Sequence, residues 1–285
     1  MQPDSEGGRV LLVGAGPGPA DLMTVRAQRA VQGAQALLYD ALVSDEVVAL
    51  APPGCFRIQT GKRAGRACMK QDAINRLMLR LARRGLRVVR LKGGDPSIFG
   101  RVGEETSFLR ARGVPTEIVP GVTAACAAAA QFDMPLTHRG VARRVLFATA
   151  RTEGGELVEV DWSGLADGQT TLALYMGRSA ARALAKRLIA DGLAPSTPAA
   201  AIENAGGENA RLVRAPIESL AAAIETMDPD GPVLILVGEI AARATARDRR
   251  EPASTPVASE WPMTSGREGG EDRRAADGPL ARRGR

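Results

Sequence analysis

Residues 87–101 read RVVRLKGGDPSIFGR, and this stretch decides how the chain is interpreted. RVVRL is typical of a buried strand, and the loop that follows it begins with Gly93 and Gly94. Two glycines leave backbone amides and carbonyls open to a ligand, while Asp95 offers a carboxylate to hydroxyl groups or to a cation. A structural turn explains a glycine and a proline but not the whole string, so we predict a ligand-binding loop.

Similar apolar runs recur on both sides of this stretch and alternate with helical patterns. The spacing of Ile74, Leu77, Met78, Leu81 and Ala82 predicts a helix that stops at Gly85, and RSAARALAKRLIADG predicts another that ends at Gly192. Alternating strands and helices predict an α/β protein with largely parallel sheets. The other predicted strands are RVLLV (9–13), QALLY (35–39), TEIV (116–119), VLFAT (145–149), TLALY (171–175) and PVLILVG (232–238).

The strands fall into two groups that separate near Val119–Pro120–Gly121. We therefore predict an N-terminal α/β domain over residues 9–119, which holds the GAGPG and GGDP loops, and a C-terminal α/β domain over residues 120–245. Residues 1–8 and 246–285 are expected to be disordered, because the tail is rich in Pro, Gly, Ser and charge and has little to bury.

The composition narrows the classes of function. No apolar run approaches the roughly 20 residues of a membrane span, and the start of the chain lacks a secretory signal, so we expect a cytoplasmic protein without a membrane partner. The chain has only three cysteines, an odd number, and a single histidine, His138. These counts argue against disulfide frameworks and metal sites. The net charge of +6 suits an anionic partner, but 3% aromatic residues argue against nucleic acid.

A second glycine-rich loop, GAGPGP (14–19), directly follows the first predicted strand. Its glycines permit close approach of a ligand, but Pro19 occupies the position where a dinucleotide fingerprint needs glycine or alanine. Asp40, at the end of the next strand, mimics the acidic residue that holds a ribose. Taken alone, this loop fits either a nucleotide site or a tight structural turn.

The order of the motifs gives a more specific signal. The run PGVTA (120–124) places Thr123 in the first turn of a predicted alanine-rich helix. Over about residues 9 to 240, the chain resembles the uroporphyrinogen-III C-methyltransferases, a branch of the tetrapyrrole methylase family. The motifs that carry the resemblance are GAGPG, LLYDALVS, GKRAG, VVRLKGGDPSIFGR, VPGVTAA, MPLTHRG, LYMG and EN.

The resemblance implies two α/β domains of the class III methyltransferase type, with the active site in the cleft between them. It also implies that S-adenosylmethionine donates methyl groups to carbons 2 and 7 of uroporphyrinogen III to give precorrin-2, leaving S-adenosylhomocysteine. Precorrin-2 feeds sirohaem and cobalamin synthesis, and haem d1 in some organisms. Members of the family are typically homodimers and need no metal.

Residue by residue, the resemblance also assigns the site. Asp40 and Lys62 match a proton acceptor and a proton donor. Arg101, Arg139 and Lys62 are expected to bind substrate carboxylates, with His138 orienting. The expected cofactor-binding residues are Pro17, Gly93, Gly94, Asp95, Ile98, Thr123, Ala124, Met176 and Ala205.

Glu104 is a second candidate base on the residues alone, because three-residue spacing from Arg101 places both side chains on one helix face. The plainer reading makes Asp40 a helix cap and Glu104 a solvated side chain.

The sequence departs from the family's pattern mainly where the substrate is expected, at Ala67, Val102 and Arg151. The nearest alternative is therefore a methyltransferase of a later precorrin intermediate, followed by RNA or protein methylation on the same fold. A nicotinamide-dependent oxidoreductase would use GAGPG and Asp40 but leaves GGDP and YMG unexplained, and a non-catalytic binding protein is the last alternative.

Overall fold

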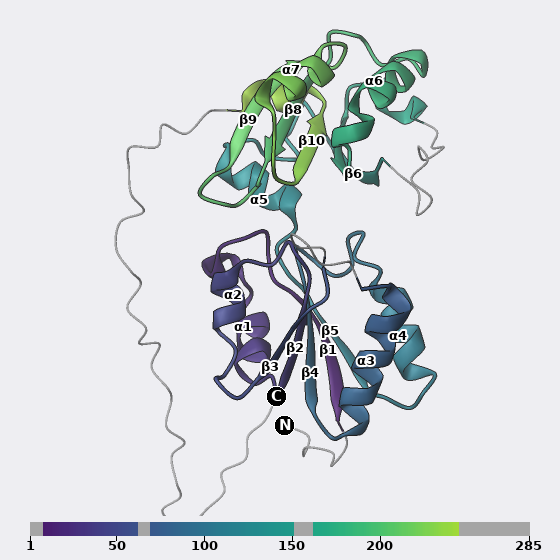
Figure 1. Ribbon diagram of the computed structural model, residues 1–285. Helices are drawn as coiled ribbons and strands as arrows, with labels where there is room; N and C mark the ends of the chain where they lie inside the picture. Colours follow the sequence, from purple (N-terminus) through teal and green to yellow (C-terminus); the bar gives the residue numbers. More distant parts are fainter. Residues whose placement is uncertain (1–7, 62–68, 151–161, 245–285) are drawn as a thin grey trace, which may run out of the picture. The chain divides into compact units, whose positions relative to one another are not determined.

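The computed structural model describes residues 8–61, 69–150 and 162–244, and these residues build two five-stranded sheets (Figure 1). In the first sheet the strand order is β3-β2-β4-β1-β5 and every pairing is parallel. Its strands are β1 (Arg9–Gly14), β2 (Ala36–Tyr39), β3 (Phe56–Gln59), β4 (Arg87–Lys92) and β5 (Thr116–Val119).

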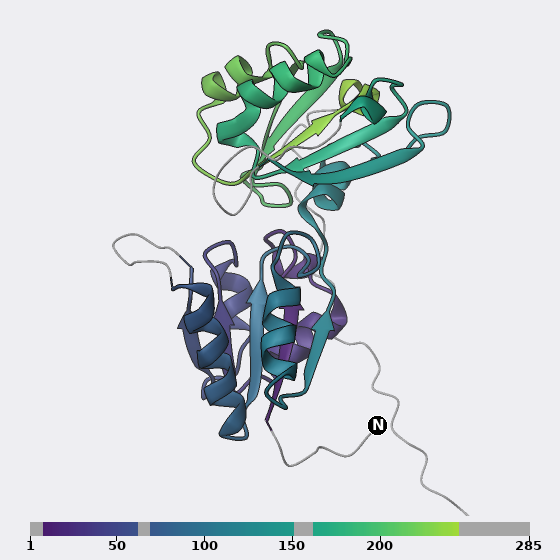
Figure 2. The same cartoon turned by 90° about the vertical axis from the view of Figure 1, so that its right-hand side faces the viewer.

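Helices cover both faces of the first sheet, as Figures 1 and 2 show. α1 (Val25–Gln32) and α2 (Asp45–Ala49) pack on one face, where Val31, Leu37 and Val47 are fully buried. α3 (Gln71–Arg83) and α4 (Val102–Arg110) pack on the other, around Met78 and Leu109. Because both faces of the sheet are covered, the inner strands β1 and β2 need continuous apolar runs, which explains why their sequences reveal them clearly.

The second sheet has the order β6-β7-β10-β8-β9. α6 (Ala181–Ala190) and α7 (Leu220–Met227) belong to the core around Leu172 and Leu174, while α5 (Ala124–Gln131) belongs to a separate core around Ile202 and Leu236. The strands of this sheet are β6 (Arg144–Thr149), β7 (Thr170–Tyr175), β8 (Pro198–Glu203), β9 (Arg211–Pro216) and β10 (Val233–Val237).

The expectation of largely parallel sheets is correct for the first sheet and wrong for the second. Only β6 and β7 run parallel there, whereas β10 is antiparallel to both of its neighbours and β9 is antiparallel to β8. The short loop between β8 and β9 accounts for the direction of that pair, since a parallel pair needs a long crossover connection. β3, β8 and β9 were not predicted, because FRIQ is short and PAAAIE is rich in alanine, which is no strand former.

Short 3-10 helices complete the described structure at Ala20–Leu22, Ser163–Leu165, Arg178–Ala180 and Glu239–Arg243. Both predicted helices are confirmed, over Gln71–Arg83 and Ala181–Ala190. Of the ends where we expect disorder, residues 1–8 and 246–285, all but Gly8 lie outside the described residues, and the boundary near residue 120 stays a prediction. No helix among the described residues is long and apolar enough to cross a membrane.

Candidate active site

A pocket of about 1060 Å³ opens at the carboxyl ends of β1, β2 and β4. Three loops of the first sheet line it, namely those after β1, β2 and β4, together with residues that follow β7 and β8 of the second sheet. The carboxyl edge of a parallel sheet is the place where ligands bind in open α/β folds. Its volume lies just above the roughly 300–1,000 Å³ of a site for one small ligand, so the pocket can hold a ligand as large as a cofactor.

All nine residues that the sequence assigns to cofactor binding line this pocket, and so do Asp40 and Arg101. They come from loops far apart in the chain, from Pro17 to Ala205. Their convergence on one cavity supports the assignment, while their contact with a cofactor stays a prediction.

The two glycine-rich loops are hydrogen-bonded to each other at the pocket. The amide of Gly16 donates to the carbonyl of Gly94 (3.2 Å), and the amide of Gly94 donates to the carbonyl of Gly16 (2.7 Å). Gly94 has space for a Cβ atom, but its φ of 68° favours glycine. Gly16 and Gly121 have no such space, since a Cβ atom would lie 2.9 Å from the oxygen of Leu22 and 2.3 Å from the oxygen of Gly94, respectively. This close packing explains the glycines and exposes backbone polar groups to a ligand.

Asp95 stabilises the GGDP loop with both of its carboxylate oxygens. Oδ1 accepts a hydrogen bond from the amide of Ser97 (2.7 Å), and Oδ2 accepts one from the amide of Gly121 (2.9 Å). The carboxylate therefore fixes the backbone that borders the pocket. Any contact with a ligand would use the lone pairs that remain on these oxygens.

Four non-glycine residues that line the pocket have left-handed backbones: Phe99, Arg101, Met176 and Asn204, with φ between 50° and 56°. Such conformations cost about 1–3 kcal/mol each and gather at functional sites. The strain turns the side chain of Met176 outward, where it is 57% exposed although it follows a buried strand. An exposed methionine at the pocket provides an apolar wall for a ligand.

Tyr175 joins the end of β7 to the beginning of α5. Its hydroxyl lies 2.6 Å from Oγ1 of Thr123 and accepts a hydrogen bond from the amide of Ala125 (3.2 Å). The ring of Tyr175 also packs against Phe99, with 5.2 Å between ring centroids. Thr123 is thus the residue just before α5, not a member of its first turn, and its hydroxyl is engaged by the tyrosine.

Arg101 and Glu104 form an ion pair with two hydrogen bonds, 2.8 Å from Nε and 2.7 Å from Nη2. The two side chains meet as predicted, but not on one helix face, because Arg101 precedes α4, which begins at Val102, and has a left-handed backbone. The hydrogen bond from Arg101 lowers the pKa of Glu104 below its ordinary value. Glu104 is therefore a weaker base than an isolated glutamate, and it lies behind Arg101, outside the residues that line the pocket.

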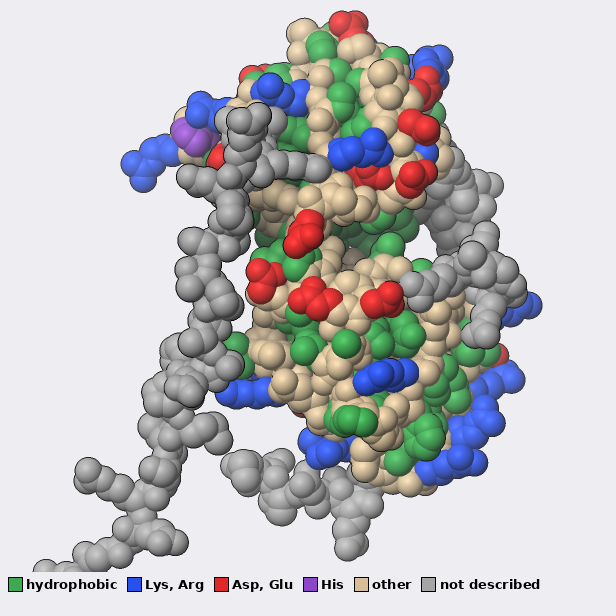
Figure 3. Space-filling view, turned by 60° about the vertical axis from the view of Figure 1, so that its left-hand side comes forward, with side chains coloured by type: hydrophobic (Ala, Val, Ile, Leu, Met, Phe, Trp, Pro, Cys, Tyr) green, Lys and Arg blue, Asp and Glu red, His purple; other side chains and the backbone are tan. Residues whose placement is uncertain are grey.

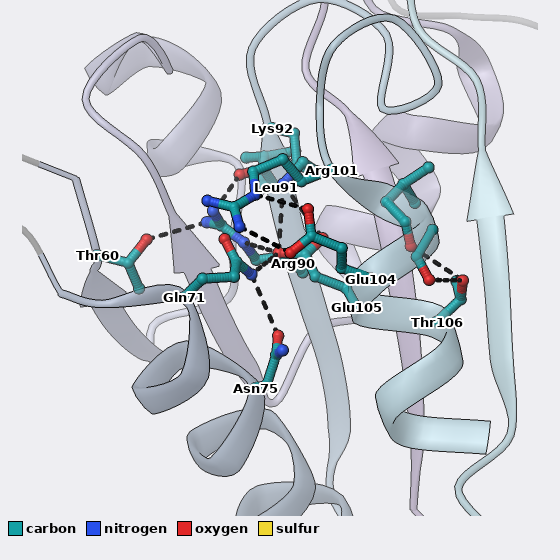
Figure 4. A network of polar contacts seen from close by, with 12 residues as sticks. Thr60, Gln71, Asn75, Arg90, Leu91, Lys92, Arg101, Glu104, Glu105 and Thr106 are labelled. Carbon is teal, nitrogen blue, oxygen red and sulfur yellow. Dashed lines mark hydrogen bonds and ion pairs between the residues drawn. The ribbon is translucent and has the colours of Figure 1, made fainter. Parts of the chain in front are cut away.

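A buried network of charged residues lies on the α3 and α4 side of β4 (Figure 4). Arg90 and Lys92 point to the same face of the strand as Val88, and both contact Glu105 of α4. Nε of Arg90 lies 3.2 Å from Oε1, and Nζ of Lys92 lies 3.1 Å from Oε2. Burial, followed by the charge of Arg90, lowers the pKa of Lys92, while Glu105 and Asp40 act in the opposite direction.

The other predicted site residues are placed as follows. Asp40 lines the pocket and accepts a hydrogen bond from the amide of Leu42 (3.1 Å), whereas α2 is capped by Ser44. His138 and Arg139 lie in the turn before β6 and are not among the described residues that line the pocket. Lys62, Ala67 and Arg151 lie outside the described residues, so their roles stay predictions.

Among the residues that the structure describes, acidic and cationic side chains line the pocket in equal numbers, whereas a cleft lined with arginine would be mainly cationic. Acidic side chains gather beside the hollow in Figure 3, and the described lining holds four acidic residues, Asp40, Glu46, Asp95 and Glu208. Four cationic residues match them: Arg90, Lys92, Arg101 and Arg178. The sequence did not single out Arg90, Lys92 or Tyr175, although all three lie within or next to the motifs RLKGGDP and YMG.

Two glycine-rich loops that line a large pocket at the carboxyl edge of a parallel sheet are typical of α/β enzymes that bind a cofactor. Residues 9–221 match the family model "Tetrapyrrole (Corrin/Porphyrin) Methylases". The chain belongs to this family.

Relatives within the family carry more specific names. Over 237 residues, which make up 83% of each protein, the chain is 44% identical to a uroporphyrinogen-III C-methyltransferase of Paracoccus denitrificans. It is also 45% identical, over 85% of its length, to a siroheme synthase of Tolumonas auensis, of which the match spans only 51%. The chain therefore spans about half the length of that siroheme synthase.

Solved structures agree with this placement. A uroporphyrin-III C-methyltransferase of Thermus thermophilus, complexed with S-adenosylhomocysteine, superposes with a TM-score of 0.71 at 40% identity over 82% of this chain and 99% of that one. A cobalt precorrin-4 methyltransferase superposes with a TM-score of 0.73 at 31% identity, over 82% of this chain and 95% of that one. The predicted fold, two α/β halves of the tetrapyrrole-methylase type, is confirmed.

Proposed function

We propose that the chain is a uroporphyrinogen-III C-methyltransferase that uses S-adenosylmethionine to add two methyl groups, at carbons 2 and 7, and forms precorrin-2. The observation that carries the proposal is the convergence of all nine expected cofactor residues on one pocket. The 44% identity to a named enzyme of this kind, over most of both chains, supports the substrate.

The residues present fit a sulfonium cofactor. Bound S-adenosylmethionine would supply an activated methyl group whose positive charge disappears on transfer. Backbone groups of Gly93 and Gly94 and the apolar side chains of Ile98 and Met176 suit such a ligand, because a strongly anionic cradle would stabilise the reactant more than the transition state.

Asp40 is the residue we propose for proton acceptance. The pyrrole carbon is electron-rich and needs no strong base before it attacks, but a proton must leave the bridging carbon afterwards. Asp40 lines the pocket and spends one oxygen, Oδ1, on the amide of Leu42, which leaves Oδ2 for this proton. We propose Lys62 as the proton donor and Glu104, held by Arg101, as a reserve base.

Anaerobic incubation with S-adenosylmethionine and uroporphyrinogen III, followed by mass analysis of the tetrapyrrole, tests the proposal. We expect a gain of two methyl increments that depends on the cofactor. Asp40→Asn should lower kcat by about 10²–10⁴-fold, the usual range for a general base. Asp21→Asn, which changes an exposed aspartate outside the pocket, should not. A wild-type protein that binds S-adenosylmethionine but adds no methyl group would contradict the proposed substrate.

One observation favours a second candidate, a methyltransferase of a later precorrin intermediate. The cobalt precorrin-4 methyltransferase superposes as well as the uroporphyrin-III enzyme does, although its identity is lower. The same mass analysis with precorrin-2 and with cobalt precorrin-4 as substrates separates the two, because a uroporphyrinogen-III enzyme methylates uroporphyrinogen III, whereas a later enzyme methylates only a later intermediate.

We further propose that the protein acts in the cytoplasm as a homodimer, with an anionic tetrapyrrole as its partner and neither nucleic acid nor membrane. The product would feed sirohaem or cobalamin synthesis, in keeping with the siroheme synthase relatives. Light scattering of the purified protein tests the dimer: a mass near 30 kDa, that of one chain, would contradict it.

A further inference from the structure

The floor of the pocket holds a buried cluster in which cations outnumber carboxylates. The side chains of Arg90 and Lys92 are 5% and 7% exposed, and both contact the fully buried Glu105. Arg90 also donates to the hydroxyl of Thr60, and Glu105 accepts a further hydrogen bond from Gln71, so the other side-chain partners of the cluster are uncharged. Direct contacts thus leave one unit of positive charge without a counter-ion in a place where water is scarce, which is unfavourable until a partner arrives.

Both cations also keep donors that the protein does not use. Among the described residues, Nη2 of Arg90 has no hydrogen-bond acceptor, since Nε contacts Glu105 and Nη1 contacts Thr60 and the carbonyl of Leu91. In the described part of the chain, Thr171 Oγ1 is the one side-chain nitrogen or oxygen that is both enclosed and without a hydrogen-bond partner. Nη2 of Arg90 is therefore not enclosed. Nζ of Lys92 donates to the two oxygens of Glu105 and has a third hydrogen left.

Other charged groups near the cluster do not use these donors. The carboxylate of Asp40 acts on Lys92 through space, but its hydrogen bond comes from the amide of Leu42. Glu104 is engaged by two hydrogen bonds from Arg101. Arg101, the cation expected to meet the substrate, is therefore already paired, whereas Arg90 and Lys92 border the pocket with spare donors.

We propose that Arg90 and Lys92 form a carboxylate-binding subsite on the floor of the pocket, which receives one carboxylate side chain of the tetrapyrrole substrate. Glu105 acts as a positioning residue that holds both cations on the same side of β4. The subsite deepens the proposed function and rests on it for the identity of the ligand. The carboxylate of S-adenosylmethionine has the same chemistry, so the test separates these two sources.

The test measures binding of uroporphyrin III, the stable oxidised form of the proposed substrate, by quenching of its fluorescence. Lys92→Met keeps the length of the side chain and removes the charge. We expect it to weaken uroporphyrin III binding about ten- to hundredfold, as loss of a charge-assisted hydrogen bond does, and to leave S-adenosylmethionine affinity within about twofold. Lys186→Met removes the same charge from an exposed position on α6 and should change neither.

A second variant keeps the proposal testable if Lys92→Met does not fold. Arg90→Lys retains the charge and the reach to Glu105 but removes Nη2, so it should weaken uroporphyrin III binding about three- to tenfold. Unchanged uroporphyrin III binding in a folded variant would overturn the subsite, and a loss confined to S-adenosylmethionine would assign the cluster to the cofactor instead.

Failure of the subsite and failure of the proposed reaction give different results. Wild-type protein that binds uroporphyrin III through Lys92 but does not methylate uroporphyrinogen III would refute the reaction and keep the subsite. Wild-type protein that methylates, paired with a Lys92→Met variant whose KM for uroporphyrinogen III is unchanged, would refute the subsite and keep the reaction.

Discussion

At the scale of single residues, the packing at Gly121 makes a sharp prediction. A methyl group there would lie 2.3 Å from the oxygen of Gly94, which is backbone and cannot swing aside. We expect Gly121→Ala to displace the GGDP loop, to lower the free energy of unfolding by about 1–3 kcal/mol, and to weaken S-adenosylmethionine binding at least about tenfold.

Gly103→Ala is the matched control, because Gly103 lies in α4 with open space around its Cα. Alanine there should be neutral or should stabilise by up to about 1 kcal/mol. Urea unfolding and calorimetric titration measure both variants. Equal affinities for the cofactor would show that the close approach of the two loops is not what shapes the site.

Neighbouring glutamates on α4 provide a second pair of variants. Glu105 is fully buried between two cations, whereas the side chain of Glu104 is 52% exposed. Glu105→Gln leaves buried cations uncompensated and should cost about 3–5 kcal/mol. Glu104→Gln breaks an exposed pair and should cost at most about 1 kcal/mol. Similar urea midpoints for the two variants would argue against the buried network as we describe it.

At the scale of elements, Tyr175 connects β7 to α5 through its hydroxyl. Tyr175→Phe removes this bond and leaves Thr123 and the amide of Ala125 without their partner, so we expect a loss of about 1–3 kcal/mol in unfolding free energy. Tyr39→Phe is the control, because no hydrogen bond of the Tyr39 hydroxyl is found in the described part of the chain. Equal melting temperatures for the two variants would contradict the proposed connection.

Strands buried on both faces could be predicted from sequence, and weakly apolar strands could not. RVLLV and VLILV are continuous apolar runs, as a covered central strand requires. PAAAIE pairs on both sides yet contains three alanines, and only tertiary contact makes it a strand. The strand directions in the second sheet could not be predicted either, because the sequence indicates where the strands lie but not which of them pair.

The glycine- and proline-rich loops of the candidate site could be predicted from the sequence, but the buried cluster of charged side chains could not. The loops of the pocket are marked by glycine and proline in fixed order, and all nine residues expected to bind the cofactor line one pocket, while their contact with a cofactor stays a prediction. Arg90 and Lys92 sit inside a run that reads as an apolar strand, and their partner Glu105 reads as an ordinary helix surface residue. Only the packing of α4 on β4 reveals that the three charges are buried together.

At the scale of the whole molecule, the buried lysine predicts a pH dependence. Burial lowers the pKa of Lys92, with Arg90 acting in the same direction and Glu105 and Asp40 opposing it; Glu104 also lies within electrostatic range. As pH rises, Lys92 loses its proton before an exposed lysine would, so affinity for uroporphyrin III should fall early on the alkaline side. Lys92→Met should remove that early fall and leave the remaining pH dependence in place.

Stability should respond to pH in the opposite sense. Between the lowered pKa of Lys92 and the ordinary lysine value, the unfolded chain binds the proton more readily than the folded chain. The free energy of unfolding should therefore rise with pH across this window, and Lys92→Met should flatten the rise. Urea titrations at several alkaline pH values measure it, and a fall with pH in wild-type protein alone would contradict the direction of the shift.

The strand order of the first sheet also affects how the chain is made. β1 is the first strand to leave the ribosome, yet it pairs only with β4 and β5, whose residues are synthesised much later. Until then its apolar RVLLV run has no neighbour, and β2 meets only β3. Contacts so distant in sequence form slowly, and exposed strands invite aggregation meanwhile. Expression that slows translation before residue 119 should therefore lower the soluble yield.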